Sequence, residues 1–381
     1  MKILHTSDWH LGRALFQESL LEDQCFALDQ IVGMVKDSRP DVLLISGDIY
    51  DRAVPSKEAV ALLDGTLRQI VGDLKVPVVM IAGNHDSPER LGFAQELLRG
   101  QGLHIVGPLP EGTPYIPFTD QHGEVRVYPL PYADPPEVRS CWGMDEVRTH
   151  QQVLEAQMAR VRMDLPAGTR AVVMAHAFVG GASVSESEED LSVGGSSLVE
   201  ASVFEGMAYV ALGHLHRPQR AGGDHIRYSG SLLKYSFSEA DHAKGVTLVE
   251  LAGPGVVTTT HLALTPRRDV RILEGAFDAF LGTGNFGNRE DYLLLRLHDR
   301  EPVVDAINRL RQVFPNVLSL DWPKRGGTGD ISVPEVNPRN ASPETLFQDF
   351  FQEITGAPWD EAQKTAFLDI AGDLARVERE A

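Results

Sequence analysis

The sequence is poor in cysteine, in long apolar runs and in positive charge. Its two cysteines, Cys25 and Cys141, lie far apart and outside any C-x-x-C pattern. This usage disfavours a disulfide framework or a thiolate metal site and fits a reducing cytoplasm. The first residues lack the apolar stretch of a signal peptide, and no window approaches the roughly 18 apolar residues of a membrane span. These absences predict a soluble cytoplasmic protein with no membrane partner.

Positive charge is scarce, with 35 Lys and Arg against 54 Asp and Glu and a net charge of −19. Because such a chain repels polyanions, its substrate is small, or local basic residues or a partner supply the missing charge. Residues 266–328 are the least acidic stretch, with ten Lys and Arg against nine Asp and Glu. Six basic residues in this stretch are candidates for contacts with backbone phosphates, although each one taken singly is more simply a solvated surface residue. They are Arg267, Arg268, Arg271, Arg289, Lys324 and Arg325.

Five short apolar runs stand out in the first two-thirds of the 381 residues, and each is typical of a buried strand. They cover residues 3–4, 42–45, 78–81, 171–174 and 209–212. Amphipathic patterns over residues 20–35 and 56–74 predict helices between them, the second with Ser56 as N-cap. Strands that alternate with helices indicate an α/β fold.

Polar residues follow every one of these strands. They are Asp8 and His10, then Asp48 and Asp51, then Asn84 and His85, then His176, and finally His214 and His216. Because sites in α/β sheets form at the carboxyl ends of strands, we expect all of them at one edge of a single layer.

This set of side chains suits a pair of divalent cations. Carboxylate, amide and imidazole donors are typical ligands, and Asp48 is placed to bridge two ions. Glycine before Asp48, Asn84 and His214 predicts sharp turns that aim the ligands. Each motif alone is weak evidence for a metal site, since a lone histidine more often has no ligand role and Asp51 could be an ordinary turn residue. Together, and in this order, they predict a two-metal phosphoesterase.

The same motifs carry a family resemblance. Asp-x-His, Gly-Asp-x-x-Asp, Gly-Asn-His-Asp, a single histidine and Gly-His-x-His resemble the calcineurin-like metallophosphoesterase superfamily over residues 1 to about 240. A closer similarity, over nearly the whole chain, is to the SbcD family, the nuclease subunits of bacterial SbcCD complexes. It rests on SESE at 185–188, SVGG at 192–195, GHLHRPQ at 213–219 and YSGSLLKYS at 228–236.

The resemblance implies a role for each residue of the motifs. One ion would be held by Asp8, His10, Asp48 and His216, and the other by Asp48, Asn84, His176 and His214. His85 would be the catalytic histidine near the leaving oxygen, oriented by Asp51, where some relatives carry histidine. Arg52 is more simply an exposed residue than a phosphate contact. The expected cofactors are two divalent ions per chain, most often Mn²⁺ in this family.

The resemblance also implies the architecture and the partners. We expect a two-layered β-sandwich flanked by helices over residues 1–265, a small α/β capping and DNA-contact domain over 266–330, and a helical tail over 331–381. The implied function is double-strand exonuclease and single-strand or hairpin endonuclease activity in DNA repair and recombination. The tail, with Phe347, Phe350 and Phe351 on an amphipathic helix, would dock on an SbcC-type coiled-coil ATPase in a heterotetramer built on a homodimer. The protein would be nucleoid-associated when bound to DNA.

Two alternatives stay open on the residues alone. One is a small-molecule or nucleotide phosphodiesterase of the same superfamily, because the metal site sees one phosphate in either substrate. The other is a non-catalytic scaffold for the ATPase, which the complete ligand set and His85 disfavour.

Overall fold

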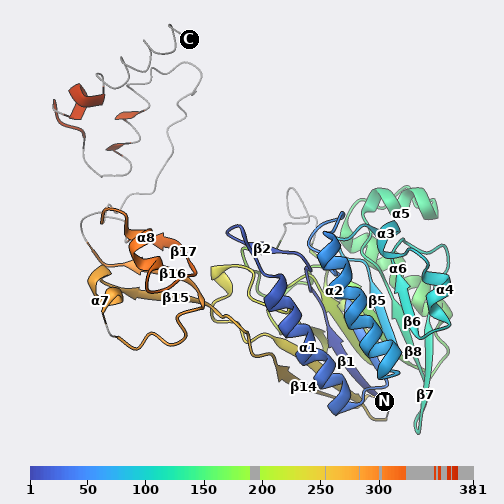
Figure 1. The fold of residues 1–381 in the computed structure, drawn as a ribbon. Coiled ribbons are helices and arrows are strands. Elements are labelled where there is room, and N and C mark those ends of the chain that lie inside the picture. Colours follow the sequence, from blue (N-terminus) through green and yellow to red (C-terminus); the bar gives the residue numbers. More distant parts are fainter. Residues whose placement is uncertain are drawn as a thin grey trace.

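The computed structural model describes residues 1–188, 198–253, 255–282, 284–299 and 303–322, together with 347–348, 351–352, 358–361 and 363–367 of the tail. Two six-stranded sheets form the body of the molecule, with helices outside them, and a smaller three-stranded unit lies beside α1 (Figure 1). The predicted fold class, a two-layered sandwich with an α/β cap, is confirmed for these residues.

The first sheet has the order β14-β13-β1-β4-β5-β6. Its last four strands run parallel, whereas β13 and β14 are antiparallel to their neighbours. The strands are β1 (Lys2–Thr6), β4 (Val42–Ser46), β5 (Val78–Ile81), β6 (Leu103–Val106), β13 (Gly245–Leu251) and β14 (Val257–Ala263). β1 therefore lies between a strand of the first fifty residues and one that comes near residue 250.

The second sheet has the order β11-β12-β10-β9-β8-β7 and also contains four parallel strands, here at its centre with one antiparallel strand at each edge. The strands are β7 (Ile116–Asp120), β8 (Gly123–Pro129), β9 (Arg170–His176), β10 (Tyr209–Gly213), β11 (Gln219–Ala221) and β12 (Gly223–Tyr228).

The five anticipated strands are therefore present, but they do not share a layer. β1, β4 and β5 belong to the first sheet, whereas β9 and β10 belong to the second. The prediction of a single layer is wrong, because apolar runs show that a strand is buried without showing what covers it. The carboxyl ends of the two parallel groups face each other at one end of the sandwich.

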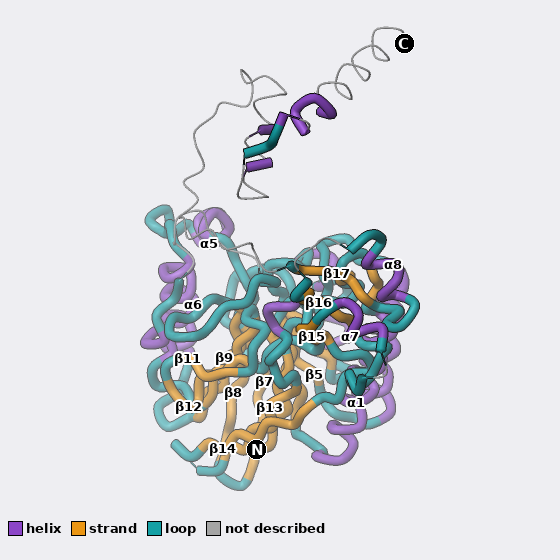
Figure 2. The backbone as a smooth tube through the Cα atoms, turned by 90° about the vertical axis from the view of Figure 1, so that its left-hand side faces the viewer, coloured by secondary structure: helices purple, strands orange, loops and turns teal. Residues whose placement is uncertain are grey.

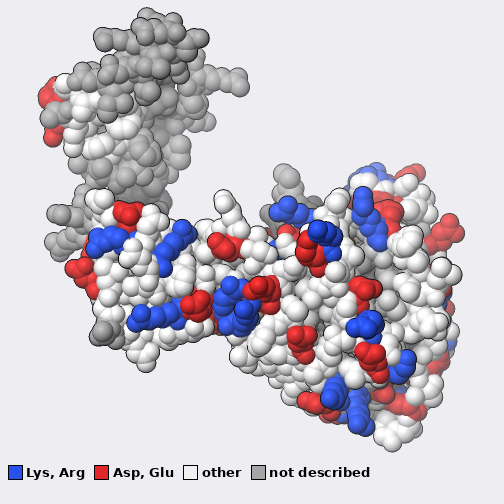
Figure 3. Space-filling view, in the orientation of Figure 1, with Lys and Arg blue, Asp and Glu red and all other residues white. Residues whose placement is uncertain are grey.

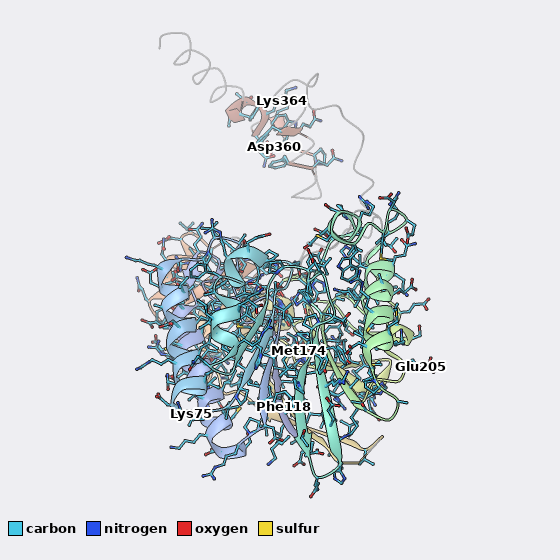
Figure 4. All side chains as sticks on the ribbon, turned by 90° about the vertical axis from the view of Figure 1, so that its right-hand side faces the viewer. Lys75, Phe118, Met174, Glu205, Asp360 and Lys364 are labelled. Carbon is cyan, nitrogen blue, oxygen red and sulfur yellow. The ribbon has the colours of Figure 1, made fainter. Side chains whose placement is uncertain are left out.

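Helices cover both outer faces, and three apolar layers result. On the first sheet lie α1 (Leu21–Ser38) and α2 (Lys57–Leu67), which continues as the π-helical segment η1 (Arg68–Asp73). On the second lie α5 (Pro135–Trp142) and α6 (His150–Asp164), on the opposite side of the molecule from α1 (Figure 2). Between the sheets is a core of β-branched and aliphatic side chains, among them Met174 (Figure 4).

Short elements complete the core region: β2 (Ala14–Leu15), β3 (Glu18–Ser19), α3 (Pro88–Leu91), α4 (Gln95–Arg99), and the 3-10 turns η2 (Ala201–Phe204) and η3 (Phe237–Glu239). The expected helices at 20–35 and 56–74 correspond to α1 and to α2 with η1. Ser56 caps α2 as predicted, because its hydroxyl accepts a hydrogen bond from the amide of Ala59 at 3.2 Å. Both cysteines are unpaired thiols, and none of the helices in the described ranges is long and apolar enough to cross a membrane.

The cap comprises residues 266–322 in the described part of the chain. A parallel sheet of β15 (Val270–Gly275), β16 (Tyr292–Leu297) and β17 (Val317–Asp321) packs with α7 (Phe277–Leu281) and α8 (Ala306–Arg311) around its own apolar cluster. Since β14 ends at Ala263 and β15 begins at Val270, we propose a domain boundary near residue 265.

The tail prediction falls largely outside the described residues. Phe350, Lys324, Arg325 and the glycine-rich stretch at 326–329 are not among them. In the described part, the rings of Phe347 and Phe367 stack with centroids 4.4 Å apart, and Trp359 lies 5.5 Å from each. The segment that holds Asp360 and Lys364 is labelled in Figure 4.

Candidate active site

Side chains from both sheets converge at the carboxyl ends of the parallel strands. Asp8, His10 and His216 form one group in which potential ligand atoms lie within 4.8 Å of one another, and Asp8, Asp48 and His176 form a second. Asp48 Oδ2 lies 3.5 Å from His10 Nε2 and 3.4 Å from His176 Nε2. This position, between one imidazole of each group, supports the proposed bridging role of Asp48.

The remaining predicted ligands lie around these groups. The Asn84 side-chain oxygen is 2.9 Å from His176 Nε2, and the His214 ring meets the His176 ring edge to face at 5.4 Å. The His214 amide donates to Asp8 Oδ1 at 2.9 Å, so the backbone of the second sheet also orients a carboxylate of the first. The structure thus brings together all seven residues expected as metal ligands.

Backbone strain marks the candidate ligands. Asp8, His10, Asp48 and His214 all have positive φ angles, of 50°, 43°, 49° and 106°. Residues other than glycine rarely adopt this conformation, which costs free energy and clusters at functional sites. The loops therefore hold these four side chains in place against the backbone's own preference.

The glycines before three ligands serve different purposes. Gly47 has a φ of 88°, as a sharp turn requires, but neither Gly83 nor Gly213 has a positive φ. A Cβ on Gly83 would instead overlap Asp48, and one on Gly213 would overlap the carbonyl of Ser46. The expectation of a turn is right for Gly47, whereas the other two glycines permit close approach between segments.

Charge is concentrated here without exposure to water. Asp48 is 2% exposed and His176 is 2% exposed. Burial alone would lower the pKa of His176, but the adjacent Asp48 carboxylate outweighs it and raises this pKa to about 9. Burial also raises the pKa of Asp8 to about 6 and lowers that of His214 to about 3.

Asp51 meets His85 through its main chain. His85 Nδ1 is 3.0 Å from the main-chain carbonyl of Asp51, so the carbonyl, not the carboxylate, accepts its hydrogen bond. The Asp51 carboxylate instead lies 3.3 Å from the Arg13 guanidinium and 3.7 Å from His10 Nδ1. Arg52 is largely exposed at 79% of its side chain, in keeping with the simpler expectation.

Two buried residues that clamp the ligand loops were missed at the level of sequence. The Asp86 carboxylate accepts hydrogen bonds from the amides of Ile49, Tyr50 and Gly83, and so joins the loops after β4 and β5. Gln24 of α1 donates to the carbonyls of Trp9 and His10 and accepts from the Gly12 amide. Asp86 directly follows the Gly-Asn-His motif, but nothing in the sequence singles out Gln24.

Comparison with known proteins places this site in a family. Residues 1–218 match the calcineurin-like phosphoesterase family, and residues 266–355 match a domain described as the type 5 capsule protein repressor C-terminal domain. The SbcD protein of Staphylococcus saprophyticus, a subunit of the nuclease SbcCD, is 34% identical over 357 residues, which are 93% of this chain and 94% of that protein. The chain belongs to the SbcD family of calcineurin-like phosphoesterases.

Two solved structures are more distant from this SbcD-family chain. A dimetal phosphatase from Danio rerio is 12% identical with a TM-score of 0.42, covering 70% of this chain and 97% of that one. The protein TT1561 of Thermus thermophilus is 15% identical with a TM-score of 0.40, covering 68% and 98%. Likenesses at these scores do not bear on the activity.

The SbcD-family side chains fit a pair of divalent cations. His10 Nε2 and His216 Nε2 face each other at 3.1 Å in a buried site. Two imidazole lone pairs at this separation repel unless a cation or a proton lies between them. Buried carboxylates and imidazoles without thiolates are the donors expected for divalent ions such as Mn²⁺ or Zn²⁺.

The cap cations suggested as DNA contacts are largely paired. Arg267 and Arg268 form ion pairs with Glu22 and Asp23 of α1, and Arg271 pairs with Asp291 at 2.7 Å. On the face shown in Figure 3, Lys and Arg alternate with Asp and Glu across the described part of the SbcD-family core and cap. These arginines tie the cap to α1 and to itself, which leaves less positive charge for a polyanion than the sequence suggested.

Proposed function

We propose that this protein is a two-metal phosphodiesterase that cleaves DNA in concert with an SbcC-type ATPase. The observation that carries the proposal is the position of Asp48 Oδ2 between His10 and His176, in a chain whose relative over nearly its full length is a nuclease subunit. Asp8, His10, Asp48 and His216 would hold one ion, and Asp48, Asn84, His176 and His214 the other. Two bound cations would activate a water and neutralise charge on the phosphate oxygens.

Residues of the chain would orient the catalytic histidine and protonate the leaving oxygen. Because the Asp51 carbonyl accepts the proton on His85 Nδ1, it turns Nε2 of this ring toward Asp48 at 3.9 Å. That atom is the one we assign to proton transfer to the leaving oxygen. The Asp86 carboxylate would keep the loops that carry Asp48 and His85 in register during turnover.

Exposed apolar side chains indicate where a second copy of the chain and the ATPase would bind. Phe93, just before α4, and Leu97, within it, are each 80% exposed, and large exposed apolar side chains favour an interface with a second copy of the chain. The aromatic rings at Phe347, Phe351, Trp359 and Phe367 suit an apolar groove or helix of the ATPase. A partner that carries basic residues would also offset the net charge of −19.

A substrate panel tests the function. The full-length protein, alone and with the ATPase, is given linear duplex DNA, hairpin DNA, a nucleoside cyclic phosphate and bis-p-nitrophenyl phosphate, with Mn²⁺, Mg²⁺ or a chelator. We expect Mn²⁺-dependent cleavage of DNA, stimulated by the ATPase. Turnover of the nucleotide with none of DNA would instead establish a small-molecule phosphodiesterase, and no turnover of any substrate would establish a scaffold.

A further inference from the structure

His216 is held by charged groups that the proposed chemistry does not use. Its ring Nδ1 lies 2.8 Å from the Ser187 hydroxyl and 3.2 Å from Glu239 Oε1. Its amide donates to Glu188 at 2.6 Å, and its carbonyl accepts from Lys244 Nζ at 2.7 Å. Ring and backbone are therefore both fixed.

Glu239 and Lys244 are a buried ion pair directly behind this ring. Glu239 is 0% exposed and Lys244 is 6% exposed, and their charged groups are in direct contact. The remaining two Lys244 protons go to the His216 carbonyl and to the Ser231 hydroxyl at 2.8 Å. Burying such a pair is rarely favourable for stability alone, because desolvation offsets the attraction.

The hydrogen bonds fix the tautomer of His216. The Ser187 hydroxyl donates its only proton to Glu239 Oε1, so it accepts at Nδ1. Glu239, ion-paired with Lys244, also accepts there. Because both of these partners of Nδ1 accept, the ring proton lies on Nδ1 and the lone pair lies on Nε2, which faces His10 Nε2 at 3.1 Å.

Other candidate ligands are oriented by weaker means. His176 Nδ1 meets the main-chain carbonyl of Ser46 at 2.9 Å, and His10 Nδ1 has no hydrogen-bond partner among the described residues. Neither has a carboxylate that is itself neutralised by a buried lysine. Glu239 also belongs to none of the three potential ligand groups formed by the described part of the chain, so its place is behind the site.

We propose that Glu239 and Lys244 are a positioning pair that holds His216 as the Nδ1-protonated tautomer, with Nε2 presented to a metal ion. Glu239 makes the imidazole a better donor, as a carboxylate does behind a metal-bound histidine. Lys244 keeps Glu239 in place and prevents a third negative charge from accumulating beside Asp8 and Asp48. The role toward metal rests on the proposed function, whereas the tautomer does not.

The test compares Glu239→Gln and the double variant Glu239→Gln/Lys244→Met with the full-length protein. Long-range ¹H–¹⁵N NMR of metal-free, histidine-labelled protein reports the His216 tautomer, with His216→Asn to assign the signal. Mn²⁺ titration calorimetry reports the two affinities. We expect the wild type to show one Nδ1-protonated tautomer, and both variants to show a mixture. One of two Mn²⁺ affinities should fall about 10- to 100-fold, with the other unchanged.

The matched control is Asp120→Asn, which breaks the partly buried Asp120–Arg170 pair at the opposite end of the sandwich. It should lose stability and keep both Mn²⁺ affinities. A fixed tautomer and two unchanged affinities in the Glu239 variants would overturn the inference. A wild type that binds no Mn²⁺ would defeat the proposed function, and its NMR spectrum would still decide the tautomer.

Discussion

The two ends of the sandwich differ in backbone strain and in how their buried charges are paired. At the carboxyl ends of the parallel strands, four candidate ligands have positive φ and buried carboxylates face buried imidazoles. At the amino ends, Asp120 accepts from the Arg170 guanidinium and from the Met1 ammonium, the latter at 2.7 Å. Arg170 also donates to the carbonyls of Ala252 and Gly123, so these charges are matched.

The contrast separates stability from function within one fold. The amino ends lock β1, β9 and the β7–β8 turn together with satisfied ion pairs. At the carboxyl ends, unfavourable backbone conformations hold the candidate metal ligands in place at a cost in stability, as is common at functional sites. Substitutions at the two ends should therefore move different observables.

The largest effect is expected for Asp48→Ala. Removal of the proposed bridge should reduce Mn²⁺-dependent DNA cleavage to background and lower occupancy of both ions, measured by metal analysis after equilibrium dialysis. The substitution also removes a buried carboxylate, whose desolvation destabilises the fold. The melting temperature of the metal-free protein should therefore fall much less than metal binding does. A variant that retains two ions per chain would show that Asp48 does not bridge.

His85→Ala should affect chemistry without metal binding. The loss of a positioned proton donor lowers turnover by about a hundred-fold to ten-thousand-fold, while Mn²⁺ stoichiometry and DNA affinity stay at wild-type values. Single-turnover cleavage and calorimetry measure the two. Lost metal would make His85 a ligand, and near-normal turnover would remove it from the mechanism.

Asp120→Asn should act only on stability. Breaking the pair leaves a largely buried Arg170 uncompensated, which lowers the free energy of unfolding at pH 7 by about 2–3 kcal/mol. The Arg170 hydrogen bond holds the pKa of Asp120 well below its usual range. The stabilisation is therefore full above the ordinary Asp pKa near 4 and is lost as pH falls below it.

Urea denaturation at pH 7 and pH 3 checks this sign, because the difference between wild type and Asp120→Asn should shrink at the lower pH. Activity at 25 °C should be unchanged. An equal difference at both pH values would mean that the ionised carboxylate is not the source of the stability.

A smaller effect is expected for Asp51→Asn, within about ten-fold of wild-type turnover. The carbonyl that meets His85 Nδ1 at 3.0 Å is kept. The substitution weakens the carboxylate's contacts with Arg13 at 3.3 Å and with His10 Nδ1 at 3.7 Å, and ion pairs that water still reaches contribute roughly 1 kcal/mol or less. A loss as large as that of His85→Ala would give the carboxylate a direct role that this geometry does not provide.

The smallest effect on intrinsic cleavage is expected for deletion of residues 340–381, which removes none of the candidate site residues. The truncated protein should remain a folded, Mn²⁺-dependent nuclease and should no longer co-purify with the ATPase. Phe347→Ala/Phe367→Ala in the full chain is the milder companion. Full-strength ATPase binding by the truncated protein would place the docking site elsewhere.

Sequence reasoning reached the site more completely than the scaffold. The motifs predict one shared site because polar residues follow the strand ends in a fixed order. These residues are Asp8, His10, Asp48, Asn84, His85, His176, His214 and His216. The strand pattern alone predicts one layer, since periodicity does not reveal which sheet a strand joins. The family resemblance supplied the sandwich that the pattern alone did not.

Supporting residues were the part that could not be predicted. Gln24 occurs within an ordinary amphipathic helix, and Glu239 and Lys244 are two charged residues in a polar stretch. Their burial depends on contacts between segments that lie far apart in the chain, which no local pattern encodes. The same holds for the Asp51 carbonyl, because backbone groups leave no trace in residue identity.

The place of β1 has a consequence for how the chain is made. This strand pairs with β4 on one side and with β13, Gly245–Leu251, on the other. During synthesis at roughly 5–20 residues per second, one edge of β1 stays without its partner until residues 245–251 have left the ribosome. An unpaired apolar edge is prone to wrong pairing, so nascent chains arrested before residue 245 should be the species that chaperones bind most strongly.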